Sequence, residues 1–161
     1  MIQRIQTVYL FVALLLITAM FFFDSVHLIT PVGNIFMLNL TGYYTDMDGE
    51  KIIEQQQYGL SFMGGVMSLL TAITIMLYKK RVVQMRFCLY NIVFGIGLSG
   101  IMAMQIISNR NAMSAELFMK LPLIFPIIFA ILSWLAFRSI RHDHLLVISM
   151  DRLRSYKKKR P

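Results

Sequence analysis

The chain has 161 residues, of which 57% are hydrophobic and 15% are charged, and its formal net charge is +8. Soluble domains carry roughly 45–50% apolar and about 25% charged residues, and disordered chains need low hydrophobicity, so this composition excludes both classes. A positive charge can indicate nucleic-acid binding. In so apolar a chain we interpret it as a signal of membrane orientation, and we expect no nucleic-acid partner.

Four apolar runs suit a lipid bilayer, which needs about 17–25 apolar residues per helix. They cover residues 5–23, 58–78, 87–107 and 121–137, and none of them contains Asp, Glu, Lys, Arg or His. Each run must be helical, because backbone amides find no water in hydrocarbon. A cleaved signal peptide would have an apolar region of about 7–15 residues and a small-residue cleavage site. The first run is longer and ends in three Phe residues, so we predict an uncleaved helix.

The connection at residues 24–57 has the composition of β-strands. Residues 26–30 and 35–41 are rich in strand formers, and the Pro, Gly and Asn residues within 31–34 predict a turn between them. Residues 43–45 and 51–53 flank a second predicted turn at 46–49. A lone hairpin is marginal in water, so we expect a small extracytoplasmic antiparallel sheet that packs on the outer ends of the helices.

Small residues recur every four positions on the second and third predicted helices. Such stripes let two helix backbones approach closely where lipid supplies no hydrophobic driving force. They predict either packing within one bundle, which we prefer, or an oligomer interface. The stripes are Gly64, Ser68 and Ala72 on the second helix, and Asn91, Gly95, Ser99 and Ala103 on the third.

The fourth predicted helix begins with two prolines and continues beyond the membrane. Pro122 is tolerated in a first turn, whereas Pro126 lies one turn further along and predicts a bend. After residue 137 the helical pattern continues through about residue 155, and it is basic and moderately amphipathic. Such an extension attracts anionic lipid headgroups, with about 1 kcal/mol per basic residue near the surface.

The basic residues predict the orientation. Thirteen Lys and Arg residues lie in the N-terminus, the connection at 79–86 and the C-terminal tail, against three in the other two connections. By the positive-inside rule, both termini are then cytoplasmic. Polar groups at these two ends predict a cytoplasmic docking platform, unless Arg4 pairs within the chain with Asp143 or Asp151. The residues predicted for docking or for lipid headgroups are Arg4, Arg138, Arg141, Asp151, Arg152 and Arg154.

Residues that could carry chemistry are few. His142 and His144 are two positions apart, so on a helix they point to different sides and do not form a metal-binding pair. The spans lack the ionisable residues that mark proton and ion pathways, and their notable polar groups are Asn91 and Gln105. We therefore expect no catalytic residues, no metal and no cofactor.

The two ends of the chain resemble a known family. The opening sequence at 1–10, MIQRIQTVYL, is similar to the start of a domain-of-unknown-function family of small four-helix membrane proteins from Bacteroidota. The other end resembles it through Leu135, Ala136, Arg138, Ile140, Asp143 and the sequence DRLR at 151–154. The chain departs from the family pattern at His142 and His144. The resemblance implies a four-span inner-membrane protein and supplies no activity, so no catalytic residue is carried over.

The combined prediction is an all-α membrane protein with one domain over residues 1–161. It is a four-transmembrane-helix bundle with a small β-sheet between helices 1 and 2 and a cytoplasmic extension of helix 4, in a bacterial inner membrane. We expect a non-enzymatic accessory or scaffold subunit of a cell-envelope complex, with a membrane-protein partner or a second copy. The alternatives are a small-molecule or lipid-binding transporter-like protein with a site near Asn91 and Gln105, and a membrane enzyme that uses His142 and His144.

Overall fold

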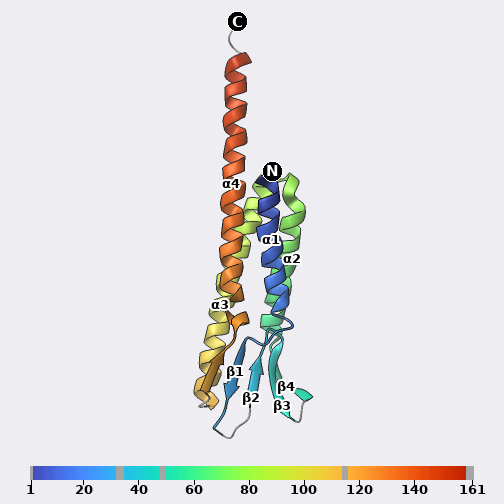
Figure 1. Cartoon of the computed structure of the whole chain (residues 1–161), viewed down its shortest axis with the longest axis vertical. Coiled ribbons are helices and arrows are strands. Elements are labelled where there is room, and N and C mark those ends of the chain that lie inside the picture. The colour runs from blue at the N-terminus through green and yellow to red at the C-terminus, as the bar shows by residue number, and fades with distance from the viewer. Residues whose placement is uncertain (1, 32–34, 48–49, 114–115, 159–161) are drawn as a thin grey trace.

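The computed structural model describes residues 2–31, 35–47, 50–113 and 116–158, and they form a mostly helical, elongated molecule with a sheet at one end (Figure 1). The four α-helices are α1 (Ile2–Ala19), α2 (Tyr58–Met76), α3 (Arg81–Met113) and α4 (Phe125–Lys158). α3 packs extensively on α4, and α1 lies between α2 and α4. In the described part of the chain, three helices are long and apolar enough to cross a membrane, and the apolar part of α1, Ile5–Ala19, is shorter.

The first helix ends earlier than its apolar run predicts. The run covers residues 5–23, but α1 ends at Ala19, and the amides of Phe22 and Phe23 both donate to the Ala19 carbonyl at 3.0 Å as the chain turns. The prediction of helix to residue 23 was wrong because hydropathy reports which residues tolerate an apolar environment, not their backbone conformation. The side chains of Phe22 and Phe23 remain exposed after the turn.

The other two connections between helices each contain a 3-10 turn. A 3-10 turn, η1 (Leu77–Lys79), joins α2 to α3, and the Lys80 amide donates to the Leu77 carbonyl at 2.9 Å. A second 3-10 turn, η2 (Leu121–Ile124), precedes α4 and contains Pro122. Pro126 is then the second residue of α4, where its missing N–H leaves no intrahelical bond unmade. The predicted bend one turn into the helix was wrong, because the α-helix begins later than expected.

The sheet has five antiparallel strands in the order β4-β3-β2-β1-β5. Four of them confirm the strands predicted between the first two helices. The fifth corrects the prediction, because it comes from the connection between α3 and α4 and pairs with β1. Residues 32–34 and 48–49 of the predicted turns lie outside the described residues. The strands are β1 (Val26–Ile29), β2 (Ile35–Leu38), β3 (Gly42–Met47), β4 (Glu50–Gln56) and β5 (Glu116–Met119).

One residue from a turn of the sheet packs in the helical core. Leu40, in the β2–β3 turn, is fully buried among bundle residues that include Met67 and Phe129, whereas the sheet packs its own apolar face around Ile106 of α3. The turn is held by Asn39, whose Oδ1 accepts the amides of Thr41 at 2.8 Å and Gly42 at 3.1 Å. These hydrogen bonds hold the turn in the conformation that buries Leu40, and the Leu40 side chain anchors the sheet to the bundle.

Candidate functional site

The end of the molecule opposite the sheet carries the N-terminus and the projecting part of α4 (Figure 1). Past Asp143, α4 continues to Lys158, which corresponds to about 22 Å of helix at 1.5 Å per residue. This confirms the predicted helical extension of the fourth apolar run. Four consecutive aliphatic side chains of the projection are exposed: Leu145, Leu146, Val147 and Ile148.

A polar contact ties α1 to α4 at the base of this projection. Gln6 is buried, and its Nε2 donates to the Oδ2 of Asp143, which is half-buried. A carboxylate at this position is therefore bonded by a neutral amide from the first helix. Four side chains of the predicted platform lie outside the described residues: Arg4, Asp151, Arg152 and Arg154.

A groove of ≈ 390 Å³ separates the α2–α3 connection from α4 at the same end. Its walls combine cationic, imidazole and aliphatic side chains, namely Lys80, Arg81, Val82, Val83, His144 and Val147. His142 is exposed, and Arg138 and Arg141 of the predicted platform are exposed as well, with the Arg138 guanidinium 5.8 Å from the Trp134 ring centroid. The groove therefore offers positive charge beside the exposed aliphatic residues of α4.

The interior of the helical bundle contains a layer of fully buried polar residues. The Nδ2 of Asn91 lies 3.5 Å from the Oγ1 of Thr74, which itself donates to the Leu70 carbonyl at 2.6 Å. Within the described residues, neither the Oδ1 of Asn91 nor the Oγ of Ser133 has a hydrogen-bond partner. Because α3 and α4 run in opposite directions (Figure 1) and Gly95 contacts Phe129, Asn91 and Ser133 lie in the same layer of the bundle.

Replacement of Asn91 tests this layer. We expect Asn91→Leu to leave the free energy of unfolding unchanged or to raise it by about 1 kcal/mol, because it removes a buried carbonyl with no partner while Thr74 keeps its bond to Leu70. Thermal unfolding in detergent measures the change, and Ser133→Ala is the matched control for the facing orphan hydroxyl. A loss of 2 kcal/mol or more, on the order of a lost buried partner, would show that the Oδ1 of Asn91 has a hydrogen-bond partner after all.

Gln105, the second polar residue of the predicted intramembrane site, does not lie beside Asn91. Gln105 is fourteen positions from Asn91 on the same helix, about 21 Å along its axis. It lies at the sheet end, where the Nδ2 of Asn109 donates to the Gln105 carbonyl at 3.0 Å and to the hydroxyl of Tyr43 in β3. Burial raises the pKa of Tyr43, and hydrogen bonds from Asn109 and Gln57 oppose that shift. The link between Asn109 and Tyr43 was missed, since no local pattern marks it.

The two small-residue stripes contact different parts of the molecule. A Cβ built on Gly64 would lie 2.3 Å from the Cδ2 of Leu40, so Gly64 makes room for the sheet residue that enters the bundle. A Cβ on Gly95 would lie 3.1 Å from Phe129 and 3.3 Å from the Pro126 carbonyl oxygen, so Gly95 lets α4 approach α3. Ser68 and Ala72 are half-buried on α2, and on α3 Asn91 is buried, Ser99 half-buried and Ala103 exposed.

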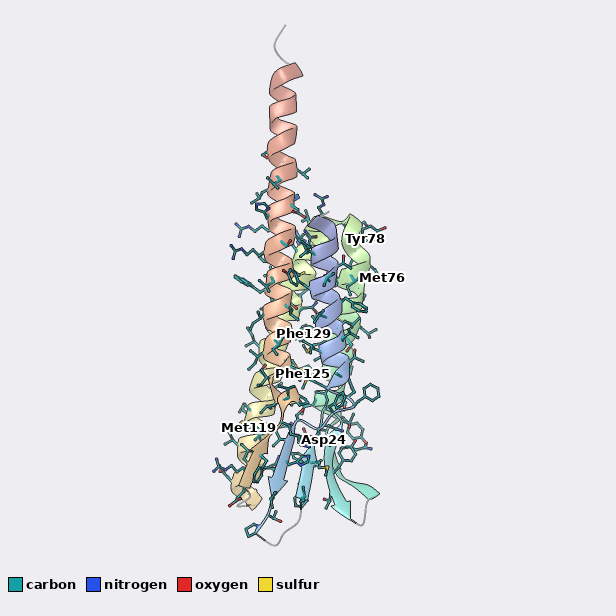
Figure 2. All side chains as sticks on the ribbon, viewed as in Figure 1. Asp24, Met76, Tyr78, Met119, Phe125 and Phe129 are labelled. Atoms are coloured by element: carbon teal, nitrogen blue, oxygen red, sulfur yellow. The ribbon has the colours of Figure 1, made fainter. Side chains whose placement is uncertain are left out.

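A second groove, of ≈ 350 Å³, runs along the half of α3 that lies nearer the sheet. It begins where the stripe residues Ser99 and Ala103 are no longer covered by α4, and Met119 of β5 forms its other side (Figure 2). Phe125 and Phe129 line the core side of α4 instead (Figure 2). Among the described residues that line this groove, Arg110 is the one with a charged side chain.

Comparison with known proteins places the chain in a family. No curated protein matches it. The family model for a domain of unknown function, DUF4293, matches residues 2–153, which is nearly the whole chain and includes every helix and strand except the last residues of α4. The family carries no described activity, so it adds no site residue to those above. The chain therefore belongs to the DUF4293 family of uncharacterised proteins.

Proposed function

We propose that the protein is a four-span integral protein of a bacterial inner membrane, with both termini in the cytoplasm and the sheet outside. An origin in Bacteroidota, implied by the resemblance of the two ends, belongs to the same proposal. The asymmetry of Lys and Arg supports the orientation. The arrangement of the elements is consistent with it, because the sheet and the projecting part of α4 lie at opposite ends of the bundle (Figure 1).

Its proposed role is that of a non-enzymatic accessory or scaffold subunit of a cell-envelope complex. The observation that carries this role is the projection of α4, which leaves Leu145, Leu146, Val147 and Ile148 exposed on a helix that stands clear of the bundle. Exposed aliphatic residues grouped on one element mark interaction surfaces. The adjacent groove with Lys80 and Arg81 favours a protein partner that combines apolar with acidic side chains.

The topology is tested with reporter fusions. We expect a reporter fused after Gln57 to be active outside the membrane and one fused after Arg160 to be active in the cytoplasm, because thirteen of the sixteen Lys and Arg residues lie on the second side. A fusion after Met113 provides a second outside position. The reverse pattern, or opposite sides for the N- and C-terminal fusions, would contradict the four-span arrangement.

The scaffold role is tested by isolating the protein from its native host in mild detergent, with a photo-crosslinking residue at Val147. We expect one envelope protein at fixed stoichiometry that crosslinks at this position. The double substitution L145E/I148E should reduce its recovery at least tenfold, because replacing an apolar anchor of an interface costs about 2 kcal/mol or more. The control L145M/I148M should retain it. A wild-type protein recovered reproducibly as a solitary monomer would argue against the role.

The transporter-like alternative receives less support. Asn91 and Gln105 are about 21 Å apart along α3, and this separation does not favour one small-molecule site that uses both residues. Asn91 faces a closed layer, and Gln105 lies beside the sheet contact of Asn109. A lipid would bind at a different position, in the groove along α3 that contains Ser99, Ala103 and Arg110.

A further inference from the structure

The groove on the outer half of α3 arises from the way β5 is placed. β5 pairs with β1 and draws the chain toward the sheet, so α4 begins only at Phe125 and leaves the end of α3 uncovered on one side. The uncovered stretch is lined mainly by aliphatic and Met side chains, with the small residues Ser99 and Ala103 among them, and the groove has a volume of ≈ 350 Å³. The residues used in the argument are Ser99, Ala103, Ile107 and Arg110 of α3, Met119 of β5 and Ile127 of α4.

The length of the groove matches one lipid chain. Ser99 and Arg110 are eleven positions apart, or about 16 Å along the helix axis. One leaflet is half of a hydrocarbon core of about 30 Å. An acyl chain that lies along α3 from Arg110 therefore reaches Ser99 near the middle of the bilayer. A further groove of ≈ 330 Å³ shares Ser99 and Ile127 and continues toward Trp134.

Arg110 supplies a positive charge at the end of the groove nearer the sheet, where a lipid headgroup would lie. Arg110 is exposed and lies three residues beyond the end of the apolar run at 107. Among the residues that the structure describes, no carboxylate forms an ion pair with Arg110. A guanidinium binds phosphate oxygens through two parallel hydrogen bonds, which a neutral headgroup cannot match.

We propose that this groove binds one phospholipid, with an acyl chain against Ser99, Ala103 and Ile107 and the phosphate on Arg110. The inference rests on the proposed membrane topology, which puts Arg110 at the outer headgroup level. A second copy of the chain fits the groove less well. A two-fold axis along the membrane normal would bring two Arg110 side chains to the same height across the contact, where like charges repel.

Native mass spectrometry of the purified full-length protein tests the proposal with phosphatidylglycerol and with diacylglycerol that has the same acyl chains. We expect one retained phosphatidylglycerol per chain and at least tenfold weaker retention of diacylglycerol. Arg110→Gln should weaken phosphatidylglycerol retention about tenfold or more, since a hydrogen-bonded charge is lost. Lys120→Gln, which removes an exposed cation outside the groove lining, is the matched control and should have no effect.

Ala103→Phe fills the groove and should abolish retention of both lipids while the thermal unfolding temperature stays within a few degrees of wild type. If Arg110→Gln and Lys120→Gln weaken phosphatidylglycerol retention equally, retention depends only on general surface charge and the proposal is overturned. Dimers that retain no lipid would assign the groove to a second copy and overturn it as well. The measurement needs neither a protein partner nor a native membrane, so failure of the scaffold role or of the topology is detected separately by the fusions and the crosslink.

Discussion

Gly95→Leu should be among the most destabilising single substitutions in the helical bundle. Its side chain would have to occupy space already held by Phe129, Ala130 and the Pro126 carbonyl oxygen, all within 3.3 Å of the first added carbon. Phe129 is fully buried and the Pro126 carbonyl belongs to the backbone, so neither can move aside without shifting α4. Overpacking of this kind costs about 1–3 kcal/mol and occasionally more, and we expect the upper end of that range.

The measurement is thermal unfolding in detergent, followed by the fluorescence of Trp134, the single Trp of the chain. Gly95→Ala should give a smaller loss, because the added methyl group meets contacts of 3.1–3.3 Å that need only a small displacement. Gly100→Leu is the matched control on the same helix, since a Cβ there meets no atom within 4 Å. Equal unfolding temperatures for the Gly95 and Gly100 variants would mean that α3 and α4 are not packed as described.

Leu40→Ala should detach the sheet from the bundle. Leu40 is fully buried in the helical core, and removing a buried Leu side chain costs about 2–5 kcal/mol when its surroundings cannot collapse. The cavity would open beside Gly64, whose backbone sits directly against the missing group. We expect the helices to keep their circular dichroism while the sheet becomes sensitive to protease at lower temperature.

A second substitution gives this prediction its control. Gly64→Ala alone should destabilise the protein, because its Cβ would lie 2.3 Å from the Leu40 Cδ2. In the Leu40→Ala background the same change should be neutral or stabilising, since the added methyl group enters the cavity and residues in contact do not behave additively. Gly65→Ala, where a Cβ meets nothing within 4 Å, should act alike in both backgrounds. Additive effects of the Leu40 and Gly64 changes would refute the contact.

Local patterns in the sequence were sufficient for most elements but not for their ends. β1 to β4 follow from dense strand formers separated by turn residues, and α2 and the body of α3 follow from charge-free apolar runs. The end of α1 at Ala19 could not be predicted, because Phe22 and Phe23 are as apolar as the helix before them. The start of α4 at Phe125 could not be predicted either, because Pro122 and Pro126 both suit a first turn.

Features that depend on distant partners were not predictable from one sequence. β5 is four residues long, and its partner β1 lies about ninety positions earlier in the chain, so nothing in the local composition marks the pairing. The same holds for the contact of Leu40 with Gly64. The small-residue stripe on α3 was visible, but its division into a covered half at Gly95 and an open half at Ala103 depends on where α4 begins.

The unbroken helix α4 has a mechanical consequence. It has 34 residues, so it is a rod of about 51 Å that begins beside the groove along α3 and ends well beyond the opposite end of the bundle. A tilt of about 5° around its first turn displaces the far end by about 4 Å, given that length. Ile127 lines the groove along α3 and Val147 lines the groove that contains Lys80 and Arg81, so one continuous helix contributes to both grooves. Any change in the tilt of α4 at the first groove would therefore also move Val147 at the second.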